Sequence, residues 1–520
     1  MKKERVDEKF NDAAINLAIN TIKKGKQALV FANTKRSAEK TAEDISGKIK
    51  SEDKKLVELS EEVLHSLSRP TKQCERLSRC IKKGIAFHHA GLVTKQKEVI
   101  EENFKKGVIK IICCTPTLAL GVSLPAFRTI HKDLRRYGPR GLAYIPVLEY
   151  LQMAGRAGRP EWDDYGEAII VAASENEKKK LKDMYIDGEP EDIYSKLAVE
   201  PVLRMYVLSL IASNFVNTKK EIFDFFGKTF WAFQFADTFE LQQTVEKMLG
   251  LLEEWEFLKS SKEDFVSAGD IDDESYRATL LGKRVAELYI DPLTAHNFVE
   301  SVRKATSKKI ISFSFLQMIS DSLELKPLLR VKTKEYDKIQ EELAKYEQYL
   351  LEGEPNVYEA EYDDFLNSVK TALFFLEWID EKDEEYLLEN YDIRPGEIRI
   401  KLGIADWLLY AAEELTRILK FQPLLKEIVK LRIRVKNGVR EELIPLLRLK
   451  QVGRVRARKL FFNKIKTIGD VREADFMRLV QILGRKVALD VKKQVGQDFE
   501  KVKIKEGKRK GQISLEDYNE

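Results

Sequence analysis

The first part of the chain alternates short apolar runs with stretches whose apolar residues recur at helical spacing. The apolar runs predict four strands, QALVFA (27–32), GIAFHHAG (84–91), IKIICCT (109–115) and EAIIVAA (167–173). A polar cap at Asn33 or Thr34, and Pro116 after the third run, mark places where helices begin. Alternation of this kind favours a parallel sheet covered by helices on both faces.

Candidate ligand-binding residues directly follow several of these strands. They are Thr34, His88, Thr115 and the start of the motif QMAGRAGRP at 152–160. Ligands of parallel α/β sheets bind at the carboxyl ends of the strands. We therefore expect these residues to gather at one edge of the sheet.

The pattern changes along the rest of the chain and predicts a multi-domain fold. A polar stretch at 174–190 is typical of a linker, and three helical patterns with two short strands then favour a winged helix. Almost continuous helical patterns follow, and then a helix, a glycine turn and a second helix. The expected units are an α/β domain at 1–185, a winged-helix domain at 186–284, an all-α helical bundle at 285–440, a helix–hairpin–helix domain at 441–500 and a flexible tail at 501–520.

Composition narrows the class of protein. The chain has 520 residues, of which 43% are hydrophobic and 34% charged, so it can bury several cores. It contains no apolar run of about 18 residues, and we expect a cytoplasmic protein without membrane contact. Four cysteines without paired C-x-x-C spacing and five histidines indicate neither a metal site nor disulfides.

The charge is distributed unevenly. Residues 426–466 hold fourteen Lys or Arg against three Glu, a net charge of +11. Because the whole chain carries +5, the remaining residues carry −6. One basic block in a mildly acidic chain indicates a nucleic-acid footprint, and a solvated helical face is the alternative.

The motif at 152–160 places a glutamine and two arginines at helical spacing. Gln152, Arg156 and Arg159 lie three and four residues apart, which would put all three on one side of a short helix. Guanidinium groups suit phosphate because they are planar, charged and bidentate. The alternative is an ordinary basic turn on the surface.

Four motifs together resemble a known family. QALVFANTKRSAE, AFHHAGL, TPTLALGVSLPA and QMAGRAGRP occur in the order and spacing of the second RecA-like domain of superfamily 2 helicases. AFHHAGL is typical of the superkiller-like branch. With the predicted winged helix, bundle and helix–hairpin–helix, essentially the whole chain resembles the archaeal Hjm DNA helicases, relatives of HELQ.

The resemblance implies that ATP and Mg²⁺ lie between two RecA-like domains, the first carrying a phosphate loop and an acidic box. No G-x-x-x-x-G-K-[ST] occurs here, and GKTF (227–230) only imitates its end, with Ile222 where the first glycine belongs. We therefore expect that the first RecA-like domain is absent and that this chain alone does not hydrolyse ATP.

The resemblance also assigns roles at the nucleotide. Arg156 and Arg159 would meet the γ-phosphate of ATP and stabilise the charge of the transition state, and Gln152 would position that phosphate or the attacking water. Gly121 would allow close approach of the backbone to the nucleotide. Ser123 stands where the family usually has Asn.

The expected contacts to DNA begin with hydroxyl groups at helix starts. Thr34, Thr115 and Thr117 offer hydroxyls and backbone N–H groups to strand phosphates, with simple helix capping as the alternative. His88 either lines the nucleic-acid path or is an ordinary turn residue.

Residues 127–150 have two extended arms around a Gly-Pro-Arg-Gly turn. In the resembling helicases a hairpin here splits the duplex, so Tyr137 or Tyr144 would stack on the last base pair while Arg140 holds phosphate. A plain loop is the alternative.

The helix expected over 397–419 has a core face and an opposite face. Ile398, Leu402, Ala405, Leu409 and Ala412 share the core face. Trp407 projects from the other face, beside Ile400, Gly403 and Ala411, as a platform for stacking a base.

An interdomain contact is the other interpretation of Trp407. The resemblance implies that this helix is a ratchet, with an arginine where Ile400 stands, and Arg399 and Lys401 flank that position.

Near the end, Gly453 lies in a turn resembling a hairpin whose N–H groups bind backbone phosphate. Arg454 and Arg456 supply positive charge there. Gln451 replaces the usual first glycine of such a turn.

These features predict the larger part of an ATP-dependent 3′-to-5′ DNA helicase that acts on branched or stalled-fork DNA in repair. An RNA helicase of the same branch and a non-enzymatic single-strand-binding protein are the rivals. In the tail, Gln512, Leu515 and Tyr518 have the spacing of a sliding-clamp ligand, and a solvated tail is the alternative.

Overall fold

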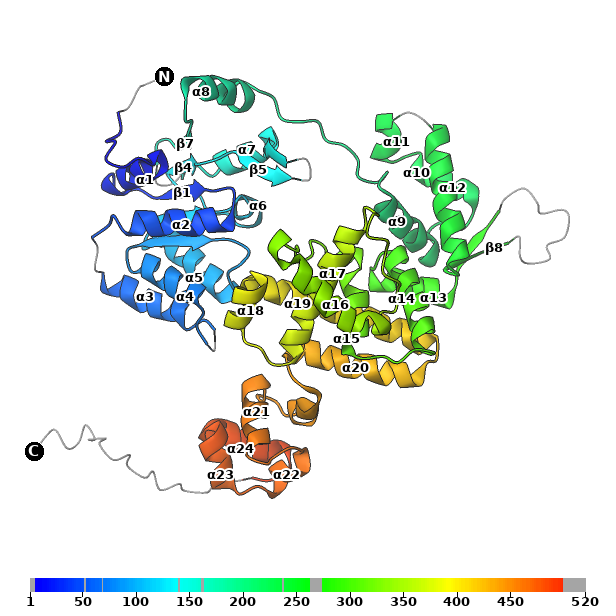
Figure 1. Ribbon diagram of the computed structural model, residues 1–520. Helices are drawn as coiled ribbons and strands as arrows, with labels where there is room; N and C mark the ends of the chain where they lie inside the picture. The colour runs from blue at the N-terminus through cyan, green and yellow to red at the C-terminus, as the bar shows by residue number, and fades with distance from the viewer. Residues whose placement is uncertain are drawn as a thin grey trace, which may run out of the picture.

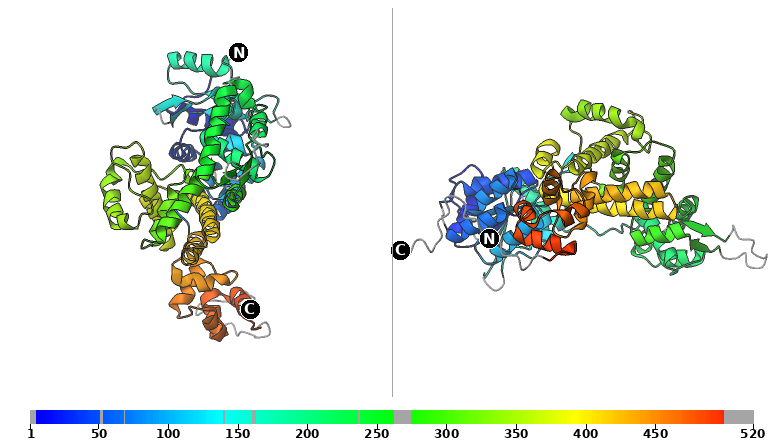
Figure 2. Two further views of the ribbon diagram at one scale, coloured as in Figure 1. Left: turned by 90° about the vertical axis from the view of Figure 1, so that its right-hand side faces the viewer. Right: turned by 90° about the horizontal axis from the view of Figure 1, so that it is seen from below.

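The computed structural model describes residues 5–50, 53–67, 69–138, 141–159, 163–235, 238–261 and 274–498. An α/β lobe lies beside a larger helical region, and the helices α21–α24 form a third, smaller lobe (Figure 1). The left view of Figure 2 shows the α21–α24 lobe projecting from one end of the molecule.

A five-stranded parallel sheet forms the centre of the α/β lobe, with the strand order β2-β3-β1-β4-β7. The strands are β1 (Ala28–Phe31), β2 (Ile85–His88), β3 (Ile111–Cys114), β4 (Arg128–His131) and β7 (Glu167–Ile170). The four predicted strands and their parallel arrangement are confirmed. Strand β4 was missed, because its polar Arg128 and Thr129 are buried rather than exposed. Arg128 is satisfied there by Glu167 and by the Thr21 hydroxyl.

Helices cover both faces of this sheet, and a hairpin extends from it. The helices are α1 (Ala13–Lys23), α2 (Lys35–Ser46), α3 (Lys54–Leu64), α4 (Lys72–Ile81), α5 (Thr94–Lys105), α6 (Thr117–Gly121) and α7 (Val147–Ala154). The hairpin pairs β5 (Arg135–Gly138) with β6 (Gly141–Tyr144), so its two extended arms are confirmed. The stretch expected as a linker is partly helical, because Ser174 caps α8 (Glu175–Leu181), which continues into η1 (Lys182–Ile186).

Residues 186–284 form helices with a two-stranded antiparallel sheet. The elements are α9 (Glu200–Ala212), α10 (Lys219–Phe226), α11 (Phe230–Phe235), α12 (Thr238–Glu254), β8 (Leu258–Ser260) and β9 (Tyr276–Ala278). Helix α11 was not among the three predicted helical patterns of this segment. Its six residues are too few to show a helical period.

The rest of the described chain is helical. The larger region contains α13 (Leu280–Leu288), α14 (Pro292–Ala305), α15 (Ser312–Ser320), α16 (Tyr336–Tyr346), α17 (Tyr362–Ile379), α18 (Glu384–Tyr391), α19 (Pro395–Ile418), α20 (Gln422–Asn437) and the short turns η2 (Leu323–Leu325), η3 (Thr333–Glu335) and η4 (Glu347–Tyr349). The small lobe contains η5 (Glu441–Arg448), α21 (Arg454–Phe462), α22 (Ile468–Glu473), α23 (Phe476–Leu483) and α24 (Arg485–Gln494).

Three large apolar cores hold these parts together. One core fills the α/β lobe, and another fills the small lobe from Val439 to Val491. The largest runs without a break from Leu203 to Val435, so the predicted winged-helix and bundle segments share one core. The boundaries expected between these domains stay predictions.

Two features of the described residues bear on the expectations about membranes and disulfides. Within the described ranges, no helix is both long enough and apolar enough to cross a bilayer. The four cysteines are free and buried.

A buried ion pair joins α9 to the start of α14. Arg204 Nε lies 2.5 Å from Asp291 Oδ1 and Arg204 Nη2 lies 2.7 Å from Asp291 Oδ2, so the contact is bidentate. Asp291 also caps α14 by accepting from the Leu293 amide at 2.9 Å.

We predict that Asp291→Asn lowers the free energy of unfolding by about 3–5 kcal/mol, because Arg204 keeps a buried charge without a counter-ion. Asparagine still caps the helix, so the loss isolates the ion pair. Urea unfolding followed by circular dichroism measures it. In the exposed pair Lys326–Asp364 the matched change Asp364→Asn should cost at most about 1 kcal/mol. Equal losses in the two variants would contradict the assignment.

Candidate nucleic-acid and nucleotide interface

A cavity of about 650 Å³ lies at the carboxyl edge of the sheet. Strands β1, β2 and β3 end level with one another, since Phe31 and His88 both pair with Cys114. Among the residues lining the cavity are Thr34, Thr115, Thr117 and Gln152, together with Arg394 of the helical region. The predicted gathering of candidate residues at this edge is therefore confirmed for Thr34, Thr115 and Gln152, and Thr117 joins them.

The threonine hydroxyls at this edge also support the local backbone. Thr34 caps α2, with its Oγ1 accepting from the Ser37 amide at 3.1 Å. The hydroxyls of Thr115 and Thr117 lie 2.9 Å apart on either side of Pro116. Capping is compatible with binding, because an oxygen atom that accepts from the helix leaves its O–H free to donate to a phosphate.

His88 does not line this cavity. Its side chain is buried, and Nε2 lies 2.9 Å from Glu101 Oε1 on α5. His88 is the last residue of β2 rather than part of a turn, and its side chain packs between β2 and α5.

The helix expected across the motif 152–160 ends early. Helix α7 stops at Ala154 with Gly155 as its C-cap, and Gly158 has φ +94°, which turns the chain. Gln152 is therefore helical, whereas Arg156 and Arg159 lie beyond the helix. The prediction that all three share one helix face is wrong, because two glycines break the helical period.

The two arginines lie at the amino edge of the sheet, away from Gln152. Arg156 donates to the carbonyl of Ala119 on α6, whose last residue is the exposed Gly121. Arg159 donates to Gln27 Oε1 at 2.7 Å, just before β1, and forms an ion pair with Asp163. Hydrogen bonding from Arg159 lowers the pKa of Asp163 below its ordinary value, even though burial raises it.

Arg159 borders a second cavity, of about 720 Å³. Four lysines share its lining with Arg159: Lys26, Lys105, Lys106 and Lys110. Gln152 is not part of this lining, so the motif spans two sites on opposite edges of the sheet.

The hairpin β5–β6 lies on the cavity side of the lobe. Gly138 pairs with Gly141 at the turn, and Tyr137 pairs with Leu142 through the backbone. Arg140 lies outside the described residues, as does the side chain of Tyr137. The Tyr144 ring has Lys180 Nζ 4.6 Å from its centre.

Helix α19 keeps its predicted core face but not all of its predicted free face. The five apolar residues expected on the core face are buried. Ala411, expected on the opposite face, is also buried, because α20 and α13 both pack against α19. Trp407 is half-buried, and its indole N–H donates to the Leu288 carbonyl at 2.9 Å. Trp407 is therefore held on one side by Leu288, and its predicted role in stacking a base stays a prediction.

The cations that flank Ile400 have protein partners. Arg399 Nη2 lies 3.1 Å from Glu384 Oε1. Lys401 donates to the Pro327 carbonyl at 2.8 Å, and burial lowers the pKa of Lys401. Ile400 itself is exposed.

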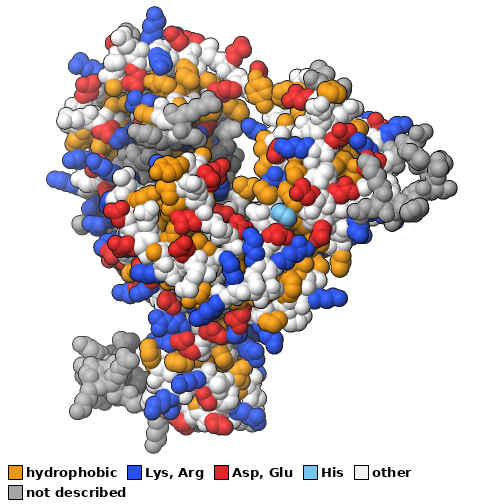
Figure 3. All heavy atoms as spheres, turned by 45° about the vertical axis from the view of Figure 1, so that its right-hand side comes forward, with side chains coloured by type: hydrophobic (Ala, Val, Ile, Leu, Met, Phe, Trp, Pro, Cys, Tyr) orange, Lys and Arg blue, Asp and Glu red, His pale blue; other side chains and the backbone are white. Residues whose placement is uncertain are grey.

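Part of the basic block at 426–466 is paired with acidic residues. Arg432 pairs with Asp406 and Glu413, and Arg458 pairs with Glu381 and Glu442. Folding thus brings carboxylates from outside the block against two of its arginines, and the expected nucleic-acid footprint stays a prediction. On the face shown in Figure 3, Lys and Arg side chains are interleaved with acidic ones.

The turn before α21 is formed as expected, and its arginines differ. Gly453 is the N-cap of α21. Arg454 lies over the Trp378 ring at 4.9 Å and donates to the Lys382 carbonyl, which docks the small lobe on α17. Arg456 is exposed and donates only to the Gln451 carbonyl among the contacts of the described chain.

A second helix–glycine–helix turn was missed. Gly484, with φ +82°, joins α23 to α24, and Arg485 and Lys486 after it are exposed. The signal for it was present in the sequence ILGRK, an apolar helix end followed by glycine and two cations.

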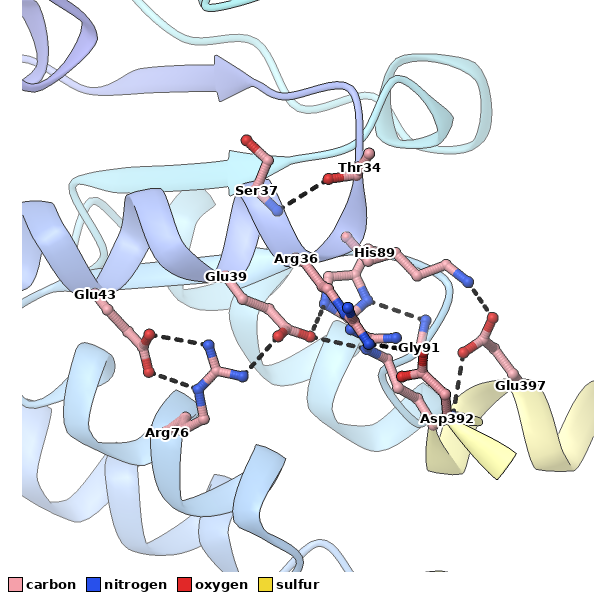
Figure 4. Close-up of polar contacts among 12 residues, drawn as sticks. Thr34, Arg36, Ser37, Glu39, Glu43, Arg76, His89, Gly91, Asp392 and Glu397 are labelled. Carbon is pink, nitrogen blue, oxygen red and sulfur yellow. Dashed lines mark hydrogen bonds and ion pairs between the residues drawn. The ribbon is translucent and has the colours of Figure 1, made fainter. Parts of the chain in front are cut away.

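Buried polar residues join the α/β lobe to the helical region (Figure 4). Glu39 on α2 is 2% exposed, and its Oε1 lies 2.9 Å from Arg394 Nε and 3.1 Å from His89 Nε2. Its Oε2 lies 2.7 Å from Arg76 Nη1. We call Glu39, Arg76, His89 and Arg394 the Glu39 cluster.

The protonation states of this cluster follow from its contacts. Burial alone would raise the pKa of Glu39, but His89 and Arg394 outweigh burial and lower this pKa to about 2. Burial lowers the pKa of His89 below 6.5. The Gly91 amide donates to His89 Nδ1 at 3.1 Å, so the neutral ring carries its proton on Nε2, toward Glu39.

Two protein families match this chain, one in the α/β lobe and one in the helical region. The family "Helicase conserved C-terminal domain" matches residues 9–161, which include the carboxyl-edge cavity. The family "Archaeal helicase, domain 4" matches residues 313–438, which include α19. The ATP-dependent DNA helicase Hel308 of Pyrococcus horikoshii is 38% identical over 515 residues, covering 97% of this chain and 68% of that protein. The chain belongs to the Hel308 family.

Other Hel308 proteins agree with this assignment. The Methanococcus vannielii protein is 35% identical over 525 residues, covering 94% of this chain and 68% of its own length. The Caldivirga maquilingensis protein is 34% identical over 524 residues, with 96% and 68% covered. The resemblance to archaeal superfamily 2 DNA helicases is thus confirmed as Hel308-type.

We predict that Glu39→Gln lowers the melting temperature most at neutral pH. Because the folded pKa of Glu39 lies near 2 and the ordinary value is 4.5, its stabilisation is complete above about pH 4.5 and is lost as the pH falls toward 2. The difference in melting temperature between wild type and variant should therefore shrink between about pH 7 and about pH 3. A constant difference would show that Glu39 is not held as a carboxylate.

Proposed function

We propose that this chain forms the part of a Hel308-type, ATP-dependent DNA helicase that grips DNA and completes the nucleotide site. The observation that carries the proposal is the meeting of Thr34, Thr115, Thr117 and Gln152 at one cavity beside α19. The segment that contains the cavity and the segment that contains α19 both match helicase families. The relatives are DNA helicases by name, which disfavours an RNA substrate.

The strand would be held through its phosphates at the carboxyl-edge cavity. Thr34, Thr115 and Thr117 offer hydroxyl donors, and such contacts position a strand without reading its sequence. From there the strand would reach α19, where the exposed part of the Trp407 ring stacks on a base and Ile400 contacts its neighbour. Arg399, Lys401 and Arg454 would support this path mainly by holding the helices in place.

The hairpin and the small lobe would contact the duplex and the emerging strand. Tyr137 or Tyr144 would stack on the last base pair, and Arg140, outside the described residues, would hold phosphate. Gly453 and Arg456 at one helix turn, and Gly484 at the next, would bind backbone phosphate. We assign the segment with β8 and β9 to a winged helix, because helices are followed there by two antiparallel strands. We assign the small lobe to a helix–hairpin–helix, because glycine turns at Gly453 and Gly484 begin two of its helices.

The nucleotide would lie at the amino edge rather than at the DNA cavity. Arg159 and four lysines line one cavity, and this density of positive charge fits a polyphosphate. Arg156 donates to the Ala119 carbonyl of α6, the helix that ends at Gly121. The 520 residues contain no phosphate-loop sequence, so we infer that ATP and Mg²⁺ are held mainly by a further domain, with Arg156 and Arg159 closing the site. Gln152, expected beside them, lines the carboxyl-edge cavity instead.

When bound, ATP supplies the free energy of unwinding through hydrolysis of its terminal phosphate. The residues of this chain would stabilise and orient the phosphate groups. Arg159 would leave its ion pair with Asp163 and bind phosphate instead, and its guanidinium stays charged during this exchange. We further propose 3′-to-5′ movement on forked DNA in the cytoplasm. Docking on a sliding clamp through Gln512, Leu515 and Tyr518, outside the described residues, remains a proposal.

We predict that Arg159→Ala abolishes DNA-stimulated ATP hydrolysis in this chain joined to the remaining part of a Hel308 relative. Turnover should fall by about 10³-fold or more, as for a lost arginine finger. Single-strand affinity should be unchanged, because Arg159 lies at the opposite edge from the DNA cavity. Phosphate-release assays and fluorescence anisotropy measure the two quantities.

The exposed Arg303→Ala is the matched control and should leave turnover unchanged. The 520-residue chain alone should hydrolyse no ATP. If that chain alone hydrolysed ATP and Arg159→Ala abolished this activity, the proposal that a further domain holds most of the nucleotide site would be contradicted.

A further inference from the structure

The interface between α2 and the start of α19 combines close backbone packing with a buried charge. The Gly396 amide donates to the Gly91 carbonyl at 3.0 Å. A Cβ atom at Gly396 would lie 2.3 Å from the Leu92 carbonyl oxygen, so no other residue fits without displacing backbone. A Cβ at Gly91 would lie 2.3 Å from Arg394 Cδ. Side chains larger than hydrogen are excluded from both surfaces of this contact.

Arg394 is the centre of this contact. It is the N-cap residue of α19, and Pro395 starts the helix, so its position fixes where α19 begins. Its guanidinium enters the α/β lobe and meets Glu39, beside the neutral His89. Its side chain also lines the carboxyl-edge cavity next to Thr34.

Glu397 adds a second connection. Its carboxylate accepts from the Arg394 backbone amide at 3.2 Å and forms an ion pair with Lys35, the residue after Thr34. The same glutamate therefore closes the first turn of α19 and binds the first turn of α2. Because Thr34, Lys35 and Glu39 belong to one helix start, the cavity and α19 are held by the same few residues.

Burial determines which of these contacts matters most. The outlying ion pairs, such as Lys72–Glu389 and Arg36–Asp392, have exposed cations and contribute little. Glu39 and Arg394 are buried, so separating them takes the buried Arg394 guanidinium away from its carboxylate partner and leaves Glu39 with Arg76 as its cation, which is unfavourable. Such an interface is either closed or open, with few states between.

We propose that Arg394 is a positioning residue that locks α19 to α2, so that the carboxyl-edge cavity and α19 bind one DNA strand as a single rigid unit. The DNA half of this statement rests on the proposed function, whereas the lock does not. A rigid unit engages the second part of a strand without a further search once the first part is bound. It also transmits any movement of the α/β lobe directly to α19.

The lock is tested by hydrogen exchange on the full 520-residue chain. In Arg394→Gln and in Gly396→Ala, we expect exchange in the segments 89–97 and 393–402 to rise about tenfold or more. Exchange in β1, β3 and α17 should stay at the wild-type rate, which shows that the variants are folded. Lys72→Gln, at an exposed ion pair of the same interface, should change nothing. Unchanged exchange in folded Arg394→Gln would overturn the lock.

The positioning role is tested on the same proteins by the length dependence of binding to oligothymidine. Wild type should bind a strand of about 16 nucleotides much more tightly than one of about 5. Arg394→Gln should lose about tenfold or more of this gain while keeping its affinity for the short strand. A loosened interface with an unchanged gain would overturn the positioning role. Failure of wild type to bind either strand would contradict the proposed function, and the exchange rates would still decide the lock.

Discussion

The contact between the Glu39 carboxylate and the Arg394 guanidinium joins two parts of the molecule that have separate cores. Each side has its own apolar core, and neither core extends across the boundary. The contacts that cross the boundary include the buried Glu39–Arg394 ion pair, the Lys35–Glu397 ion pair and a hydrogen bond between two glycine backbones. A polar contact of this kind fixes orientation more strongly than an apolar one, because only one geometry satisfies every charge. The relation between the DNA cavity and α19 depends on it.

The residues of the motif QMAGRAGRP lie at two different edges of the sheet. Helix α7 runs from the carboxyl edge toward the amino edge, and Gln152 and Arg159 therefore lie at different cavities. One short segment thus connects the surface proposed for DNA with the surface proposed for the nucleotide. A change in the contacts of Arg159 with Asp163 and Gln27 would reach the DNA cavity through a single helix of eight residues.

The sequence predicted best what depends on local pattern. Strands β1, β2, β3 and β7 are continuous apolar runs, as buried parallel strands require, and residues that follow a strand must lie at its carboxyl edge. Strand β4 escaped prediction because Arg128 is buried with partners from α1 and β7 that no local pattern reveals. The helix does not continue through Arg159 as predicted, because Gly155 and Gly158 end it and turn the chain. The contacts of Trp407, Arg432 and Arg458 with Leu288, Asp406 and Glu381 could not be predicted for another reason: no local pattern links these residues to their partners. Arg394 gave no signal at all, since a lone arginine before proline is ordinary until Glu39 is seen beside it.

The most direct test of the account asks whether α19 and the cavity hold the same strand. Tryptophan fluorescence of the 520-residue chain is recorded while a 3′-tailed DNA is added, and the change in Trp407→Phe is subtracted. The account predicts quenching assigned to Trp407, together with an affinity loss of about 1–3 kcal/mol in Trp407→Ala. It also predicts that Thr115→Val weakens binding while leaving the Trp407 quenching at saturation unchanged. Equal quenching in wild type and Trp407→Phe, with equal affinity in Trp407→Ala, would contradict the account and leave Trp407 as a packing residue against Leu288.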